Sequence, residues 1–366
     1  MNSYYYPIKT AAWHFLIVAF LFTIPYMIYN YRKYGSVSIL RSFIIYTFIY
    51  YLLSALYLVI LPLPAPSALS GTRMDFVQLV PFKFITEFIT KVPLDIKSLI
   101  GIKTIIASHQ FIQPVFNIIL TIPFGIYLRY YFKTDLKKTI LFSFLLSVIF
   151  EVTQLTGIYG IYKLPYRVFD VDDLFLNTLG GLIGFYIAGL AIKILPSKKN
   201  IDEKSIEKGQ VVSFTRRLIA FMFDIVFANI IAALISFIIG IKYYAILIFL
   251  YFIIFSIFLK GRTFGKMIVK IRTSKNQEGR IPLPILIVVK YASVYLIYEI
   301  LTYLIFKLDT RLLISSRAGT ILILLIELGV ILLFIIDAIY GYFHNKRLWY
   351  ERISNTKNES YTKKEH

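Results

Sequence analysis

Residues 167–190, with the sequence RVFDVDDLFLNTLGGLIGFYIAGL, decide the fold class of this chain. The second part of this stretch is apolar and continues to residue 195, and a membrane-spanning helix needs about 20 mostly apolar residues. The carboxylates of Asp170, Asp172 and Asp173 stand at its edge. Each charged residue at bilayer depth costs about 2.5–3.5 kcal/mol on insertion scales, so such a cluster needs partners or a function. The stretch therefore predicts a membrane helix with a polar site at its mouth.

The composition of the whole chain is that of a membrane protein. Its 366 residues are 58% hydrophobic and 17% aromatic, which exceeds the apolar share of ordinary soluble domains. The chain has no cysteine, so disulfides and cysteine nucleophiles are excluded. Its net charge of +20 is explained by Lys and Arg in cytoplasmic loops and at anionic headgroups. No nucleic-acid module accompanies this charge, so nucleic acid is not an expected partner.

About nine segments have the length and apolar character of membrane helices. They lie near residues 11–29, 43–61, 112–131, 138–156, 171–195, 217–240, 243–259, 285–306 and 320–341. Loops rich in Lys and Arg follow every second segment, beginning after the first, and such an excess is typical of cytoplasmic loops. The pattern predicts an all-α, multi-pass protein of the cell membrane, with its N-terminus outside and its C-terminus in the cytoplasm.

A polar, charged segment over residues 196–212 divides the chain. A proline opens it, and its composition is typical of a linker. We therefore expect a first membrane domain with five helices over residues 1–195 and a second with four helices over residues 213–356. Residues 357–366 are predicted to form a polar tail.

Polar residues lie at the outer ends of the fourth and fifth predicted helices. Asp170, Asp173 and Asn177 are three and four residues apart, a spacing that places side chains on one helix face. Glu151 and Gln154 form a matching polar face on the preceding helix. The predicted ligand-binding residues of this outer face are Glu151, Gln154, Arg167, Asp170, Asp172, Asp173 and Asn177. Small residues follow on the same stripe at Gly180 and Gly184, which would let a neighbouring helix pack closely.

Two interpretations of the outer carboxylates remain open. In one, they form a pocket for a cationic or hydroxyl-rich headgroup, or for an oxygen-ligated divalent ion. In the other, Arg167 neutralises one aspartate while the others cap the fifth helix. Paired carboxylates can also perform acid/base chemistry, but no nucleophile or histidine accompanies them. The pattern therefore predicts no catalytic residue, no cofactor and no metal-binding motif, and does not favour an enzyme.

The first half of the chain resembles the VanZ-like family of bacterial membrane proteins over most of residues 15–195. The resemblance is carried by the pair Pro81-Phe82, by FNIILTIPFGIYL at residues 116–128, by Glu151 with Gln154, and by the run from Arg167 to Gly184. That family is associated with reduced susceptibility to teicoplanin-type glycopeptides. The resemblance thus implies an envelope function at the outer leaflet.

A second polar group is expected on the inner side of the second half. Arg217 and Asp224 are seven residues apart, two turns along one helix face. Asp337 occupies a similar depth in the last helix, and the loop at residues 261–275 is cationic. These charges predict internal ion pairing. The predicted residues of this inner-face polar site are Arg217, Asp224, Lys266, Asp337 and Glu351.

This half resembles the RDD family over about residues 210–356. The matching residues are Arg217, Ala220, Asp224, Gly261, Thr263, Gly265 and Lys266, with the closing motif HNKRLWYERISNT at residues 344–356. Glu351 stands where the family usually has its second aspartate, so either Glu351 or Asp337 takes that role. The family is linked with transport.

Charged residues inside the later spans also allow two interpretations. Asp224, Glu299, Glu327 and Asp337 could form a proton or cation path, as a transporter needs. Alternatively, they form packing pairs, such as Lys290 with a carboxylate.

We therefore expect an integral membrane protein that binds or modulates an envelope lipid or amphiphile at the outer leaflet and lowers teicoplanin-type susceptibility. The alternative is a secondary transporter with an ion path through the RDD-like half. Expected partners are membrane lipids and an amphiphilic or lipid-linked envelope ligand, and the sequence does not predict the oligomeric state.

Overall fold

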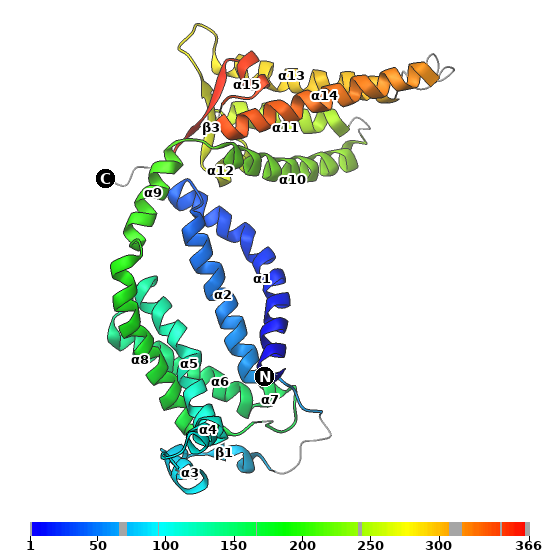
Figure 1. The fold of residues 1–366 in the computed structure, drawn as a ribbon. Coiled ribbons are helices and arrows are strands. Elements are labelled where there is room, and N and C mark those ends of the chain that lie inside the picture. The colour runs from blue at the N-terminus through cyan, green and yellow to red at the C-terminus, as the bar shows by residue number, and fades with distance from the viewer. Residues whose placement is uncertain are drawn as a thin grey trace. The chain divides into compact units, whose positions relative to one another are not determined.

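The computed structural model describes residues 2–65, 72–93, 95–165, 167–240, 244–306, 317–344 and 346–362. This part of the chain is mostly helical, with two short two-stranded sheets (Figure 1). Seven of its helices are long and apolar enough to cross a membrane, and two further apolar helices are shorter. The predicted all-α, multi-pass membrane fold is confirmed, and the expected count of about nine spans is compatible with these helices.

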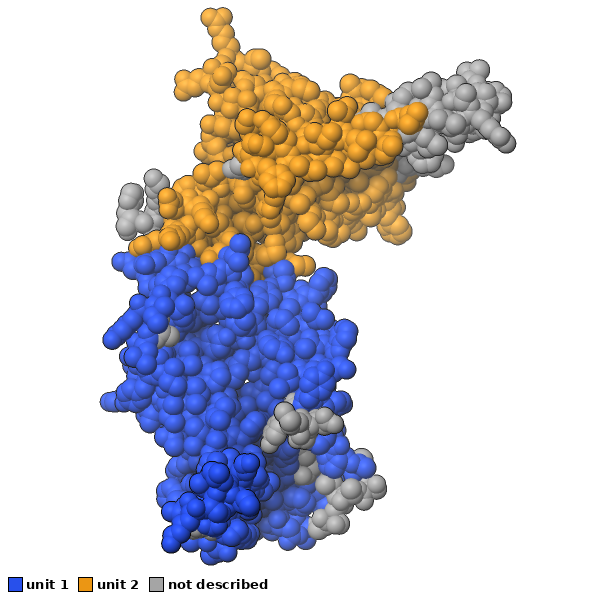
Figure 2. Space-filling model, in the orientation of Figure 1, with its two compact units in different colours: residues 1–23, 39–201 blue, residues 24–38, 202–366 orange. Residues whose placement is uncertain are grey.

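The chain divides into two compact units, which Figure 2 shows in different colours. Unit 1 comprises residues 1–23 and 39–201, and unit 2 comprises residues 24–38 and 202–366. Helix α1 (Asn2–Tyr34) contributes to both units. The segment predicted as a polar linker forms helix α9 (Lys198–Gln210), which begins in unit 1 and continues into unit 2.

Unit 1 is built around long apolar helices. Besides the first part of α1, these are α2 (Ile39–Ile60), α5 (His109–Tyr130), α6 (Leu136–Leu155) and α8 (Val171–Ile194). The most extensive helix contact joins α5 with α8. A Cβ atom at Gly180 would lie 2.1 Å from the Ile118 carbonyl oxygen, and one at Gly184 would lie 2.0 Å from that of Ile122. Glycine therefore permits the close approach of these two backbones.

The structure identifies the neighbouring helix that the small residues of α8 are predicted to admit. The glycine stripe packs chiefly against α5, which is the third long helix after α1 and α2. Helix α6 meets the stripe at Gly181, where a Cβ would lie 2.0 Å from Ser143 Oγ. The spacing of small residues predicts a close helix contact, but the identity of the partner depends on the tertiary fold.

Short elements of unit 1 lie at the end where α8 begins. They are η2 (Arg73–Phe76), β1 (Val77–Gln78), α3 (Lys83–Lys91), α4 (Leu99–Ala107), α7 (Gly157–Gly160) and β2 (Phe169–Asp170). Strands β1 and β2 pair in parallel, with Gln78 opposite Asp170. Because Asp170 lies on β2 and α8 starts at Val171, the prediction that Asp170 shares a helix face with Asp173 and Asn177 is wrong.

Unit 2 combines the end of α1 and most of α9 with further helices and a hairpin. Its other elements are α10 (Phe214–Ile239), α11 (Tyr244–Phe258), α12 (Phe264–Ile268), β3 (Ile271–Lys275), α13 (Leu283–Phe306), α14 (Arg317–His344), α15 (Trp349–Ile353) and β4 (Thr356–Ser360). Strands β3 and β4 are antiparallel, so the segment predicted as a polar tail begins inside a strand. Tyr31 of α1 packs with Ile219, Val269 and Ile271 in the core of this unit.

Candidate functional site

An acidic cavity of about 570 Å³ opens in unit 1. Its walls come from α2, α5 and α6, from β2, and from the first turns of α8. Six of the seven predicted outer-face residues line it: Glu151, Gln154, Arg167, Asp170, Asp173 and Asn177. The remaining wall is largely apolar and includes Leu58, Phe116, Leu120 and Phe150. The cavity thus has one acidic side and one apolar side.

Two of the acids are held at the wall by hydrogen bonds to uncharged groups. Glu151 is 2% exposed, and its Oε2 accepts the backbone N–H of Asp170 at 3.0 Å. The Asp173 carboxylate accepts Asn117 Nδ2 at 2.5 Å. Within the described parts of the chain, neither acid forms an ion pair with a basic side chain. A buried carboxylate without a cation is costly, so this wall favours a cationic or proton-donating ligand.

Asn177 adds an acceptor to the same wall. Its Nδ2 donates to Ser147 Oγ at 2.8 Å, and Ser147 in turn donates to the Asp173 carbonyl. The side chain is 3% exposed, and its Oδ1 has no partner among the described atoms. Buried polar atoms without a partner are rare in native structures. This oxygen is therefore available to a hydroxyl or amine of a ligand.

Asp172 is the one predicted outer-face residue that does not line the cavity. It is 1% exposed and accepts the backbone N–H groups of Phe82 at 2.5 Å and Phe84 at 3.1 Å. Phe82 has a φ of 60° and immediately precedes α3. Asp172 thus fixes the entry into α3, whereas the capping interpretation expects the aspartates to cap the fifth helix.

Asp170 joins the cavity wall to the β1–β2 pair. Its Oδ1 accepts the backbone N–H of Asp172 at 2.9 Å and Gln78 Nε2 at 3.3 Å. Burial raises the pKa of the Asp170 carboxyl, and the charge of Asp172 adds to this effect, while the two hydrogen bonds oppose it. The protonated form of Asp170 is therefore favoured more than in an ordinary exposed aspartate.

Arg167 and Gln154 contact the end of α2 instead of the acids. Arg167 is exposed and donates to the Leu61 carbonyl at 3.2 Å, and Gln154 Nε2 donates to that of Val59 at 3.2 Å. Arg167 makes no ion pair with a described carboxylate. The expectation that it neutralises one aspartate is not met. Its guanidinium is left to face the cavity beside the acids.

Sequence reasoning missed Gln78 and Ser147, which support Asp170 and Asn177, and it missed the apolar wall and His109, which line the cavity although no histidine is predicted near the acids. Gln78 reaches Asp170 through the β1–β2 pairing, and Leu58 arrives from α2. Of these residues, only Gln78 could have been identified from the sequence, because it stands three residues before the Pro81-Phe82 pair. Among the described residues, no group of three or more His, Cys, Asp or Glu side chains is arranged to hold a metal ion. The divalent-ion interpretation therefore gains no support.

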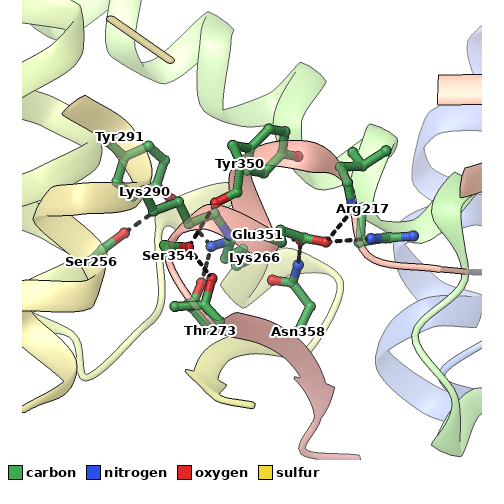
Figure 3. Close-up of polar contacts among 12 residues, drawn as sticks. Arg217, Ser256, Lys266, Thr273, Lys290, Tyr291, Tyr350, Glu351, Ser354 and Asn358 are labelled. Atoms are coloured by element: carbon green, nitrogen blue, oxygen red, sulfur yellow. Dashed lines mark hydrogen bonds and ion pairs between the residues drawn. The ribbon is translucent and has the colours of Figure 1, made fainter. Parts of the chain in front are cut away.

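Unit 2 contains a buried cluster of paired charges (Figure 3). Glu351 is 1% exposed and pairs with Arg217 at 2.7 Å and with Lys290 at 3.7 Å. Asn358 also donates to it. Lys266 Nζ donates to Thr273 Oγ1 at 2.5 Å and to the Tyr291 hydroxyl at 3.2 Å. Burial lowers the pKa of the Lys266 ammonium.

Asp224 lies beside this cluster with its own set of donors. It accepts the hydroxyls of Tyr251 at 2.8 Å and Thr263 at 2.5 Å, and the backbone N–H of Gly265 at 2.7 Å. Thr263 is the N-cap of α12, so Asp224 docks this short helix against α10. The conformation of residues 263–265 thus depends on the Asp224 carboxylate.

Asp337 has different partners from Glu351. It pairs with Arg352 and accepts the backbone N–H of Trp349 at 2.9 Å. Of the two candidates for the second aspartate position, Glu351 is the one that contacts Arg217. The pair of Lys290 with Glu351 agrees with the packing interpretation.

The described contacts do not join Asp224 to Asp337 as an ion path would require. Glu299, another predicted member of that path, is exposed. Glu327, the fourth member, has a side chain outside those that the structure describes. Sequence reasoning also missed Arg216, which is 0% exposed and donates to the carbonyls of Val269 and Lys270.

Comparison with known proteins agrees with this division. Residues 48–196 match the VanZ/LLP1 family model, and residues 211–354 match the RDD family model. The chain is similar to Protein VanZ of Enterococcus faecium, with 32% identity over 94 residues, which are 25% of this chain and 54% of that protein. The chain thus spans about half the length of this curated relative. No solved structure matches it. The chain is therefore a multi-pass membrane protein that joins a VanZ-like domain to an RDD family domain.

Proposed function

We propose that the VanZ-like domain binds an envelope lipid or another amphiphile of the outer leaflet of the cell membrane, and thereby lowers susceptibility to teicoplanin-type glycopeptides. The observation that carries this proposal is the two-sided cavity of unit 1. Its volume of about 570 Å³ is typical of small-molecule sites. An acidic wall opposite an apolar wall matches a molecule with a donor-rich head and an apolar tail.

The chemistry of the acidic wall narrows the class of ligand. Carboxylate oxygens accept hydrogen bonds. Glu151 and Asp173 therefore select ammonium or hydroxyl groups, and Asn177 Oδ1 adds a further open acceptor. Arg167 can pair with an anionic group at the same opening. A sugar- or amine-bearing lipid headgroup meets these requirements, with its tail against Phe116 and Phe150.

The link to glycopeptides comes from the VanZ-like resemblance, and drug susceptibility tests it. The chain is expressed in a sensitive Gram-positive host, and teicoplanin and vancomycin susceptibility are measured at matched membrane levels. Wild type is expected to protect against teicoplanin, whereas the Glu151→Gln/Asp173→Asn double variant returns the host to its unprotected level. Glu87→Gln is the matched control, because Glu87 makes only surface pairs with Lys83 and Lys91. A double variant that protects as well as wild type would contradict the proposed site.

Secondary transport through the RDD domain is a second candidate function. It is favoured by the charges of the unit 2 cluster, in which the described side chains are three bases, Arg217, Lys266 and Lys290, and two acids, Asp224 and Glu351. Such a cluster can exchange a proton when a lysine loses its charge. Proteoliposomes with an internal pH-sensitive dye separate the candidates. Transport predicts a flux that Asp224→Asn abolishes, whereas binding alone predicts no flux from wild type.

A further inference from the structure

A second cavity, of about 300 Å³, lies in unit 2 and belongs to neither site described above. Its floor is apolar and consists of Phe227 on α10 with Phe264, Met267 and Ile268 on α12. The rings of Phe227 and Phe264 lie 5.4 Å apart, so the two helices present one continuous apolar surface. Two cationic side chains, Arg32 and Lys270, line the same cavity.

No described acidic side chain balances the charges of these two cations. Neither Arg32 nor Lys270 takes part in any ion pair of the described chain. Arg262 stacks on Tyr361, which also lines the cavity, and adds positive charge nearby. The described acid on the adjoining strand β4, Glu359, already pairs with Arg272 and Lys357. The cavity therefore carries a net positive potential.

The backbone around Lys270 is held in place by a buried arginine. Lys270 has a φ of 53°, in the left-handed region that non-glycine residues rarely adopt. Arg216 donates to the Val269 carbonyl at 2.8 Å and to that of Lys270 at 2.9 Å. A third bond joins Arg216 to the Gly209 carbonyl at 2.7 Å. Lys270 is thus presented from a fixed turn, as a preorganised binding site requires.

We propose that this cavity binds an anionic phospholipid, with its phosphate paired to Arg32 and Lys270 and its apolar part against Phe227, Phe264 and Met267. Basic pockets beside membrane helices are suited to anionic headgroups, and guanidinium groups match phosphate oxygens well. A free phosphate would use the two cations but leave the apolar floor in water, which is unfavourable. The floor therefore favours a lipid over a small anion. This inference is independent of the function proposed for unit 1.

Lipid binding by the purified full chain tests the inference. Binding of phosphatidylglycerol and of phosphatidylcholine is measured by native mass spectrometry and by the thermal shift that each lipid produces, with inorganic phosphate as a separate probe. Wild type is expected to bind phosphatidylglycerol in preference, and the Arg32→Gln/Lys270→Gln variant is expected to bind it about tenfold more weakly. Inorganic phosphate is expected to produce no shift.

Two further variants keep the test decisive. Lys260→Gln is the matched control, because Lys260 also has a positive φ of 54° but is exposed and does not line the cavity. Arg32→Lys keeps the charge and is expected to retain the lipid preference even if the neutral variant unfolds. Equal binding of phosphatidylglycerol by wild type and the folded neutral variant would overturn the proposal. An equal shift with inorganic phosphate alone would also overturn it, since the site would then bind a small anion.

Discussion

Asp172 and Asp173 are neighbours in sequence, yet their carboxylates serve different parts of unit 1. Asp172 accepts two backbone N–H groups at the entry to α3, whereas Asp173 faces the cavity and accepts Asn117. One acid therefore stabilises the fold and the other is open to a ligand. The proposed binding function accordingly depends on Asp173 and Glu151, and a loss of Asp172 is expected to act through the fold.

Asp170 should make the stability of the protein depend on pH. Its folded pKa is raised above the ordinary value of 3.8, so the folded state binds more protons than the unfolded state as pH rises from that value. Stability therefore falls across this window. Asp170→Asn removes this fall in stability with rising pH, because asparagine does not titrate. The Asn oxygen can still accept the backbone N–H of Asp172. Thermal unfolding is expected to show the variant more stable than wild type at about pH 7 and equal to it near pH 4. If the variant exceeded wild type in stability by more at about pH 4 than at about pH 7, this prediction would be contradicted.

Glu351 should be the most sensitive charge of unit 2. Glu351→Gln leaves Arg217 and Lys290 without their buried partner, and breaking a buried ion pair costs about 3–5 kcal/mol. Glu359→Gln on β4 is the control, because its pairs with Arg272 and Lys357 are partly exposed and are worth about 1 kcal/mol or less. Thermal unfolding of the purified protein compares the two variants. Similar losses of stability from both variants would contradict the burial of the Glu351 ion pairs.

At the scale of elements, α5 and α8 pack against each other and both contribute residues to the cavity wall. The shape of the cavity therefore depends on this helix contact. Gly184→Val would place side-chain atoms against the Ile122 carbonyl, because even a Cβ atom would lie 2.0 Å from it. Overpacking of this kind costs about 1–3 kcal/mol. We expect a lower melting temperature and less folded protein in the membrane.

Gly329→Ala is the control for that substitution. A Cβ at Gly329, on α14, meets nothing within 4 Å. Alanine there is expected to preserve stability, because it has the higher helix propensity. A Gly184 variant as stable as the Gly329 variant would mean that α5 and α8 do not pack closely.

The elements differ in how far the sequence predicts them. The membrane helices follow from local apolar length, and the small-residue stripe of α8 follows from spacing. In contrast, Asp170 leaves α8 because β1 pairs with β2, and those strands are about 90 residues apart in the chain. The choice of Glu351 over Asp337 as the partner of Arg217 also depends on distant contacts. Local patterns thus predict the elements, and long-range pairing decides which polar side chains meet.

At the scale of the whole molecule, the two domains handle buried charge in different ways. Glu151, Asp170 and Asp173 of the VanZ-like domain line an open cavity and form no ion pair with a described basic side chain. Asp224, Asp337 and Glu351 of the RDD domain are instead held by ion pairs or by hydrogen bonds to the protein. An open acidic wall has acceptors left for a ligand, whereas closed pairs fix a structure. This contrast is why the proposed ligand is assigned to the first domain.

The most direct test of that assignment is the labelling rate of a single cysteine in the cavity. The chain has no natural cysteine, and Gln113 is exposed and lines the cavity. Gln113→Cys is treated in intact cells with membrane-impermeant cationic and anionic thiol reagents, with Lys208→Cys on the predicted cytoplasmic α9 as control. We expect Gln113→Cys to react from outside, faster with the cationic reagent, and Lys208→Cys to react only after permeabilisation. Labelling of Gln113→Cys only in permeabilised cells, or no preference for the cation, would contradict an acidic cavity open to the outer face.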